Sequence, residues 1–186
     1  LSIMDILMDA GASLSQLDGQ KGNIAVQRAP LRAFDVDASN CPDLFPIISV
    51  LAAFCQGTSR IAGLERLANK ESDRAKAILD MLTQMGVKAE IADDTLVVEG
   101  HSLAQRLLSY GRRGQSEGNP ASSDKCPGLL RGGSYTSHHD HRMVMALKVA
   151  SLGADSPIVI DDEECVAKSF PQFHETFNSA VMVGCN

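Results

Sequence analysis

Residues 72–99 read SDRAKAILDMLTQMGVKAEIADDTLVVE, and the period of their hydrophobic pattern changes once. The first half has the spacing of an amphipathic helix. Its apolar face is expected to comprise Ala75, Ile78, Leu79, Leu82 and Met85. Gly86 suits the left-handed position that ends a helix. Val87–Ile91 and Thr95–Glu99 then flank two aspartates, as the strands of a hairpin do. The stretch therefore predicts a helix followed by a two-stranded hairpin.

The same succession of helix, glycine and strand recurs elsewhere in the chain. Residues 6–12 (ILMDAGA) resemble residues 81–87 (MLTQMGV), and residues 52–61 resemble residues 149–160. A period this long indicates repeated βαβ-type units within one α/β domain, not a thin solenoid.

The remaining elements follow from hydrophobic pattern and punctuation by glycine and proline. Further helices are expected over residues 3–10, ending at Gly11, over 42–54, closed by Gly57, over 140–152, and from about Ser169 onward. Further strands are expected over residues 23–27, 33–37, 58–62 and 157–161. Residues 111–133 are rich in Gly, Ser, Arg and Pro, and they predict a mobile loop.

Composition excludes several classes of protein. The 186 residues are 44% hydrophobic and 22% charged, which is typical of a globular domain with a sizeable core. Seventeen Lys and Arg against 23 Asp and Glu give a net charge of −6, which argues against a general nucleic-acid binder. Aromatic residues make up 4% with no Trp, which argues against a platform for stacking bases. No apolar run approaches the roughly 20 residues of a membrane span.

The five cysteines are scattered and form no CxxC pair. Their positions are 41, 55, 126, 165 and 185. An odd number of unpaired cysteines is typical of free thiols in a reducing compartment. We therefore expect no disulfide framework.

Charged residues gather at three expected helix starts. Asp43 follows a proline, Arg74 follows the good cap Ser72, and Arg142 lies two residues after the good cap Asp140. A cation at a helix N-terminus is mildly unfavourable, because that end already carries partial positive charge. An anion bound by both the helix end and the guanidinium would explain both arginines. In the alternative, each arginine turns away and pairs with a surface carboxylate.

Three further polar groups lie beside these helix starts. Lys70 and Glu71 precede Arg74, where they form either part of a site or a solvated helix cap. His139 and His141 are two residues apart, which is not the helical spacing of common zinc motifs, so we expect no metal. Lys168 precedes Ser169, the expected cap of the last helix, and it is either a site residue or an ordinary surface lysine.

Taken in order, these segments resemble one known family. The chain carries Pro42-Asp43, Gly57-Thr58, Lys70–Arg74 (KESDR), Asp140–Met143 (DHRM) and Lys168–Pro171 (KSFP). This succession resembles the C-terminal part of 5-enolpyruvylshikimate-3-phosphate synthase (EPSP synthase, 3-phosphoshikimate 1-carboxyvinyltransferase). The resemblance implies an α/β fold, one domain of an inside-out α/β barrel built from repeated βαβαββ units. It also implies that residues 1–186 form a single domain, a C-terminal fragment of a two-domain enolpyruvyl transferase. The first residue, a Leu inside a helical pattern, agrees with this expectation.

The resemblance also implies an activity. Members transfer the enolpyruvyl group of phosphoenolpyruvate to the 5-hydroxyl of shikimate 3-phosphate and release phosphate, in the pathway to chorismate and the aromatic amino acids. We therefore expect a cytoplasmic transferase, monomeric at full length, with no metal or organic cofactor and no nucleic-acid or membrane partner. Its partners would be the two substrates and the N-terminal part of the same enzyme. Because the family's active site lies between domains, we expect no turnover by the fragment alone.

Catalytic roles are implied at three positions. By resemblance, Asp43 contacts the shikimate hydroxyls and takes part in proton transfer at the 5-hydroxyl. Glu71 would transfer a proton at the methylene carbon of phosphoenolpyruvate, with His141 nearby. Such a reaction needs proton transfers at both centres.

Substrate-binding roles are implied at four further positions. By resemblance, Lys70 contacts the shikimate hydroxyls beside Asp43. Arg74, Arg142 and Lys168 would clamp the carboxylate and phosphate of phosphoenolpyruvate. Many relatives carry another arginine just before the Lys-Glu pair, where this chain has Ala68.

Two other functions remain open from the sequence. One is the related enolpyruvyl transferase that uses UDP-N-acetylglucosamine, in which KESDR followed by DHR is not expected. The other is a non-catalytic anion-binding domain of the same fold.

Overall fold

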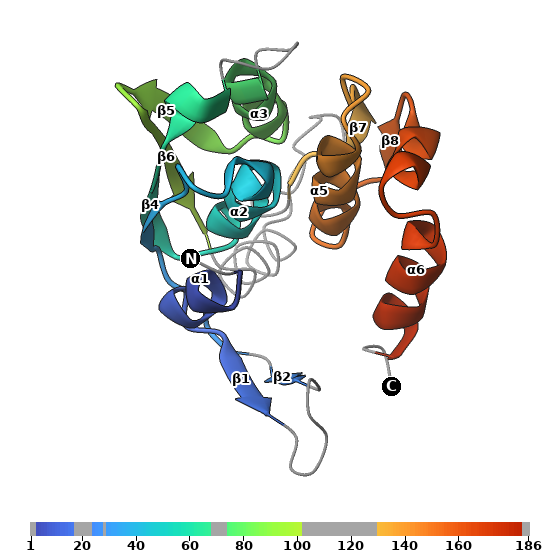
Figure 1. Ribbon diagram of the computed structural model, residues 1–186, viewed down its shortest axis with the longest axis horizontal. Helices are drawn as coiled ribbons and strands as arrows, with labels where there is room; N and C mark the ends of the chain where they lie inside the picture. The colour runs from blue at the N-terminus through green and yellow to red at the C-terminus, as the bar shows by residue number, and fades with distance from the viewer. Residues whose placement is uncertain (1–2, 17–23, 28, 68–73, 102–129, 184–186) are drawn as a thin grey trace, which may run out of the picture.

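The computed structural model describes residues 3–16, 24–27, 29–67, 74–101 and 130–183 (Figure 1). The α-helices are α1 (Ile3–Asp9), α2 (Phe45–Ala53), α3 (Arg74–Gln84), α5 (His141–Ser151) and α6 (Phe173–Val183). Short 3-10 helices are η1 (Pro42–Leu44), η2 (Leu64–Leu67) and η3 (Glu163–Lys168). Among the described residues, no helix has the length and apolar character that crossing a membrane requires.

The strands within the described residues form three sheets. They are β1 (Ser13–Gln16), β2 (Ile24–Gln27), β3 (Asp35–Asp37), β4 (Gly57–Ala62), β5 (Lys88–Ala92), β6 (Thr95–Gly100), β7 (Gly133–Tyr135) and β8 (Ile158–Ile160). The largest sheet has the order β3-β4-β6-β5, in which only the β3–β4 pair is parallel. An antiparallel β1–β2 pair and a parallel β7–β8 pair stand apart. In Figure 1, α2 and α5 lie between the four-stranded sheet and the β7–β8 pair.

The repeat expected from the sequence is confirmed by the pairing. In β3-α2-β4, a bridge from Arg32 to Gln56 precedes the parallel strands. In β7-α5-β8, a bridge from Leu130 to Ala154 does the same, with the same spacing between partners. The other two similar segments, residues 6–12 and 81–87, belong to α1 with β1–β2 and to α3 with β5–β6. Each is a helix followed by an antiparallel pair of strands. The described chain is thus built from two alternating kinds of unit.

Glycine positions confirm two predicted helix ends and correct a third. Gly11 and Gly86 follow α1 and α3 with φ of 87° and 78°, as a left-handed helix terminus requires. Gly57 does not close the apolar helix, which ends at Ala53, but opens β4. The first turn of that predicted helix is the 3-10 helix η1, because the Phe45 N–H bonds to the Pro42 carbonyl and Pro46 has no N–H to give.

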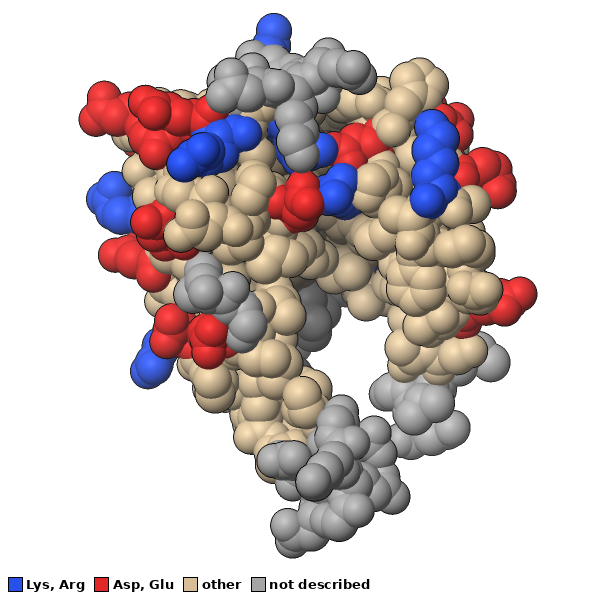
Figure 2. Space-filling model, in the orientation of Figure 1, with Lys and Arg blue, Asp and Glu red and all other residues tan. Residues whose placement is uncertain are grey.

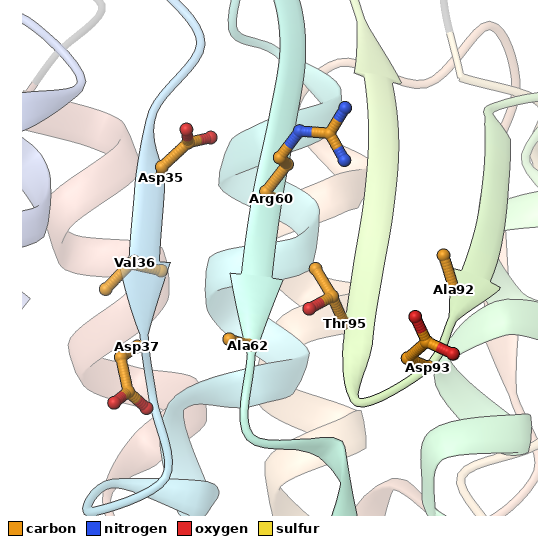
Figure 3. Close-up of a pocket in the computed structure, with 8 residues that line it drawn as sticks. All are labelled: Asp35, Val36, Asp37, Arg60, Ala62, Ala92, Asp93 and Thr95. Atoms are coloured by element: carbon orange, nitrogen blue, oxygen red, sulfur yellow. The ribbon is translucent and has the colours of Figure 1, made fainter.

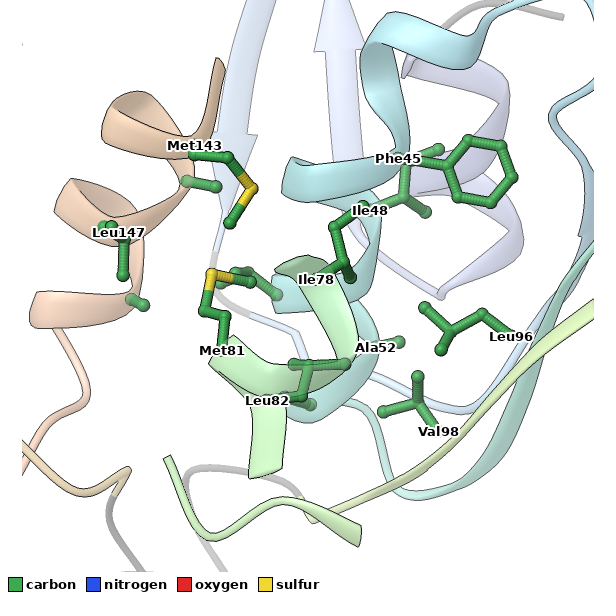
Figure 4. Packing of buried hydrophobic residues seen from close by; sticks show 14 of the residues in the cluster. Phe45, Ile48, Ala52, Ile78, Met81, Leu82, Leu96, Val98, Met143 and Leu147 are labelled. Carbon is green, nitrogen blue, oxygen red and sulfur yellow. The ribbon is translucent and has the colours of Figure 1, made fainter. Parts of the chain in front are cut away.

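The core surrounds α2 on several sides. Figure 4 shows α2 meeting α3, β6 and α5 through buried side chains. The labelled residues are Phe45, Ile48, Ala52, Ile78, Met81, Leu82, Leu96, Val98, Met143 and Leu147. A helix covered in this way is apolar almost all round, and its one polar residue, the buried Ser49, donates its hydroxyl to the Pro46 carbonyl at 2.8 Å.

The buried face of α3 differs in part from the predicted one. Ile78, Leu82 and Met85 are buried as expected. Ala77 and Met81 are also buried, whereas two predicted members, Ala75 and Leu79, are only partly buried. The face is turned because α3 packs beside both α2 and α5, as the neighbouring Met81 and Met143 show (Figure 4).

The predicted hairpin is confirmed, whereas most of the predicted loop is not tested. β5 and β6 are antiparallel around Asp93-Asp94, and Asp93 adopts a φ of 53°, as a tight turn requires. Most of the loop predicted over 111–133 lies outside the described residues. Within its last four residues, Leu130 is buried and Gly133 begins β7.

The cysteines within the described residues are unpaired. Cys41 is partly buried, and Cys55 and Cys165 are buried. Burial raises the pKa of Cys55 to about 12, so its thiol stays protonated and unreactive. The predictions for Cys126 and Cys185 lie outside the described residues.

Truncation of the central helix should destabilise the chain. Ile48 is fully buried, so Ile48→Ala should cost about 2–5 kcal/mol through lost burial and a residual cavity. The matched change Ile91→Ala, at a side chain 41% exposed on β5, should cost less than about 1 kcal/mol. Urea unfolding of the purified chain measures both, and equal losses would contradict this account of the core.

Candidate functional site

Three helix starts converge on one edge of the molecule. η1 carries Asp43, the first turn of α3 carries Arg74, and the start of α5 carries Asp140 and Arg142. Hydrogen bonds and ion pairs join these four side chains into one network, described below. Acidic and basic side chains intermingle across the upper part of the face shown in Figure 2.

Arg74 is the buried member of this network. It is 8% exposed, and its Nε donates a hydrogen bond of 2.8 Å to Oδ2 of Asp140. Its Nη1 lies 3.5 Å from Oδ1 of Asp43. A guanidinium this far from water requires anionic partners, and these two carboxylates supply them.

Asp43 links the two arginines. Its Oδ2 accepts a hydrogen bond of 2.8 Å from Nη2 of Arg142, while its other oxygen faces Arg74. The Asp43 side chain is 47% exposed and that of Arg142 is 29% exposed, so both can be reached from solvent. The exposed side of the network is therefore formed by Asp43 and Arg142.

Asp140 caps α5, as the sequence predicts. Its backbone is extended, and its Oδ1 accepts a hydrogen bond of 2.9 Å from the Arg142 N–H. Its other oxygen holds Arg74, a contact that nothing in the local sequence indicates. The side chain of Asp140 is only 10% exposed.

Both arginines pair with carboxylates, as the alternative predicts, and Asp43 is 47% exposed. Arg74 and Arg142 pair with Asp43 and Asp140, which belong to the same group of helix starts. Two cations and two anions balance within the network. The N-termini of α3 and α5 add partial positive charge at the same edge, which favours an anionic ligand there.

His141 is held in its neutral form by its surroundings. Burial lowers the pKa of His141, and the nearby Arg142 lowers it further, while Asp140 acts in the opposite direction. At neutral pH the imidazole is therefore uncharged and able to accept a proton.

The loop before α5 is held by Asp161, the residue that follows β8. Asp161 accepts hydrogen bonds from the Thr136 hydroxyl at 2.7 Å and from both the N–H and the hydroxyl of Ser137 at 2.8 Å. These bonds hold the pKa of Asp161 well below its ordinary value. His138 and His139 then adopt left-handed φ angles of 53° and 56°, and His139 contacts Asp162 at 2.7 Å. This sharp bend delivers Asp140 to the start of α5.

The predicted helix after Lys168 is corrected. Lys168 is the last residue of η3, Ser169 is the C-terminal cap of η3, and α6 begins only at Phe173. The Lys168 side chain is exposed. The 3-10 helix η3 packs against α5, and its Glu163 pairs with Lys148 of α5 at 2.8 Å. Lys168 forms no ion pair with any described residue.

Two predicted site residues, Lys70 and Glu71, lie outside the described residues, and so does Ala68. Sequence reasoning did not identify the bridging role of Asp140 or the anchoring role of Asp161. The partners of these residues are distant along the chain, so spacing alone gave no signal for them.

A hollow separate from this network lies on the outer face of the four-stranded sheet, with α2 behind the strands (Figure 3). It is lined by Asp35, Val36, Asp37, Arg60, Ala62, Ala92, Asp93 and Thr95. Three carboxylates against one guanidinium make it unsuited to anions, and it holds none of the predicted site residues.

The titration of His141 tests the electrostatics of the site. Its NMR titration midpoint should lie below the ordinary value of about 6.5. Arg142→Gln should raise that midpoint, because a neighbouring cation is removed, while Arg60→Gln on the outer sheet face should not. A folded pKa below the unfolded one also means that His141 weakens the fold as pH falls through about 6.5, with no effect above that range. An unchanged midpoint in Arg142→Gln would contradict the arrangement.

Comparison with known proteins gives a consistent result. The sequence profile of EPSP synthase (3-phosphoshikimate 1-carboxyvinyltransferase) matches residues 1–177. The 3-phosphoshikimate 1-carboxyvinyltransferase of Brachyspira hyodysenteriae is 37% identical over 178 residues, which are 95% of this chain and 36% of that protein. The enzyme of the same name from Methanocorpusculum labreanum is 36% identical over 92% of this chain and 34% of its own length. The chain thus spans about a third of the length of these curated relatives.

Solved structures agree. EPSP synthase from Acinetobacter baumannii matches 95% of this chain and 38% of its own, with a TM-score of 0.71 and 28% identity. The enolpyruvyl transferase NikO from Streptomyces tendae matches 95% of this chain and 34% of its own, with a TM-score of 0.61 and 16% identity, which shows the fold alone. The chain has the inside-out α/β fold shared by these enzymes. From the profile, the identities and the fold together, we conclude that the chain belongs to the EPSP synthase family.

Proposed function

We infer that the enzyme to which this chain contributes transfers the 1-carboxyvinyl group of phosphoenolpyruvate to the 5-hydroxyl of shikimate 3-phosphate and releases phosphate. The observation that carries this proposal is the network of Asp43, Arg74, Asp140 and Arg142 at three converging helix starts. The membership of the chain in the EPSP synthase family suggests which reaction this is.

The cations would bind phosphoenolpyruvate. Arg142 is partly exposed beside the N-terminus of α5, and Lys168 is exposed on the neighbouring η3. A planar guanidinium suits a carboxylate or phosphate, and a lysine adds a mobile point charge. We assign the carboxylate and phosphate of phosphoenolpyruvate to Arg74, Arg142 and Lys168 together. Charge stabilisation and positioning would then supply most of the acceleration.

The proton transfers would use the acidic and neutral groups. Asp43 is exposed enough to meet a hydroxyl, so we assign it to the shikimate hydroxyls and to the proton of the 5-hydroxyl, together with Lys70 at the same hydroxyls. Glu71 would exchange the proton of the methylene carbon. We assign His141, whose lowered pKa keeps it neutral at neutral pH, as a further proton acceptor for this step.

A phosphate-release assay with the full-length enzyme tests this function. Release from phosphoenolpyruvate should require shikimate 3-phosphate. Arg142→Ala should lower kcat/KM by about 10²–10³-fold, as the loss of one donor to a charged transition state does. The control Arg60→Ala, on the outer face of the sheet, should keep the wild-type value. Release only with UDP-N-acetylglucosamine would mean the sister transferase, and release with neither acceptor would favour an anion-binding domain.

The 186-residue chain alone should show no turnover. It spans about a third of the length of its curated relatives, and the site assigned here would be completed by residues outside it. The same phosphate-release assay on the purified chain, after circular dichroism shows that it is folded, measures this. Turnover above the no-enzyme rate would disprove the expectation.

A further inference from the structure

The two carboxylate oxygens of Asp140 accept hydrogen bonds from two different helices. Oδ1 accepts a hydrogen bond from the Arg142 N–H and so caps α5. Oδ2 accepts a hydrogen bond from Nε of Arg74, on a helix far away in the sequence. One side chain therefore ties the first turn of α3 to the first turn of α5.

The bond from Nε fixes more than the position of Arg74. A guanidinium is planar, so an acceptor held against Nε sets the direction in which both terminal nitrogens point. Asp43 is a weaker constraint, because its oxygen is 3.5 Å from Nη1 and its side chain is 47% exposed. Asp140 is 10% exposed and lies 2.8 Å from Nε, so it is the dominant partner.

Asp140 is itself firmly held. The residues before it are bound through the hydrogen bonds of Thr136 and Ser137 to Asp161, which directly follows β8. The Asp140 N–H also donates to the Ser137 carbonyl at 3.0 Å. An acceptor with both its backbone and its carboxylate fixed can impose its geometry on the arginine that it contacts.

We propose that Asp140 is a positioning residue for Arg74. It aligns the Arg74 guanidinium with the N-terminus of α5, so that Arg74 and Arg142 present one rigid surface to an anion carrying a carboxylate and a phosphate. Asp140 does not touch the substrate in this assignment. The identity of the anion as phosphoenolpyruvate rests on the proposed function, whereas the alignment of Arg74 does not.

Two substitutions separate positioning from capping. Asp140→Ser and Asp140→Asn both retain an oxygen that can cap α5, because Ser and Asn are good N-caps. Neither offers a carboxylate to Arg74. In the full-length enzyme we expect both to lower kcat/KM for phosphoenolpyruvate by about 10- to 100-fold, as a misplaced binding group does. The melting temperature should fall in both variants, because buried Arg74 loses an anionic partner, so kinetics are measured well below it. The KM for shikimate 3-phosphate should change little.

A matched control removes another carboxylate that pairs with α5. Glu163 binds Lys148 of α5 at 2.8 Å, away from Arg74. Glu163→Gln should keep kcat/KM within about twofold of wild type, because partly exposed ion pairs contribute little. An equal loss in Glu163→Gln and Asp140→Asn would overturn the proposal, since any disturbance of α5 would then suffice.

A double-mutant cycle tests whether Asp140 acts through Arg74. On an Arg74→Ala background, Asp140→Asn should cause little further loss of kcat/KM, because the group that it positions is gone. Losses that multiply would mean that Asp140 acts independently of Arg74, which would overturn the proposal.

The final measurement needs no catalysis. In protein labelled with ¹⁵N-arginine, the Arg74 Nε–H should be protected from solvent exchange, and Asp140→Asn should speed its exchange by at least about tenfold. Unchanged exchange would overturn the positioning role even in an active enzyme. Faster exchange in a protein that transfers no carboxyvinyl group would support the positioning role while the proposed function failed.

Discussion

A buried guanidinium cannot be left without an anion, and this requirement governs how the helices of the chain meet. Arg74 is almost wholly buried at the start of α3, and Asp140 at the start of α5 neutralises it. Removing one partner of such a pair leaves a charge out of water, which costs far more than the pair itself contributes. The apolar helix α2 packs against both α3 and α5, so core packing and the ion pair impose the same arrangement. The charged residues at this edge therefore lie where the packed helices α3 and α5 begin.

Much of the fold could be predicted because the relevant signals are local. The change of hydrophobic period at Gly86 defines α3 and the β5–β6 hairpin within one stretch of chain. Predictions failed where geometry depends on packing or on the detailed backbone path. Gly57 opens a strand because α2 ends earlier, and the turn at Lys168 is a 3-10 helix that stops before α6. Periodicity does not distinguish a 3-10 turn from the first turn of an α-helix.

The sequence identified Asp43, Arg74 and Arg142, which the structure brings together, but it did not indicate the bonds between them. Arg74 and Arg142 were identified because a cation is unfavourable at a helix start. The resemblance to a family then suggested their substrate-binding roles. The bonds themselves join residues up to 99 positions apart, which no spacing rule reaches. Lys70 and Glu71 stay predictions. The balance of charge within the network is a structural result: neighbouring carboxylates neutralise the arginines, so the helix ends supply the remaining positive potential at this edge.

The equal spacing of the strand partners in the two βαβ units gives Asp43 and His141 corresponding positions. Asp43 follows the end of β3 by the same number of residues as His141 follows the end of β7. One repeated scaffold thus delivers a carboxylate from its first copy and a neutral imidazole from its second. One residue inserted within the first turn of either helix would shift the side chains that precede it by about 100° around the helix axis, and so carry them away from the shared edge.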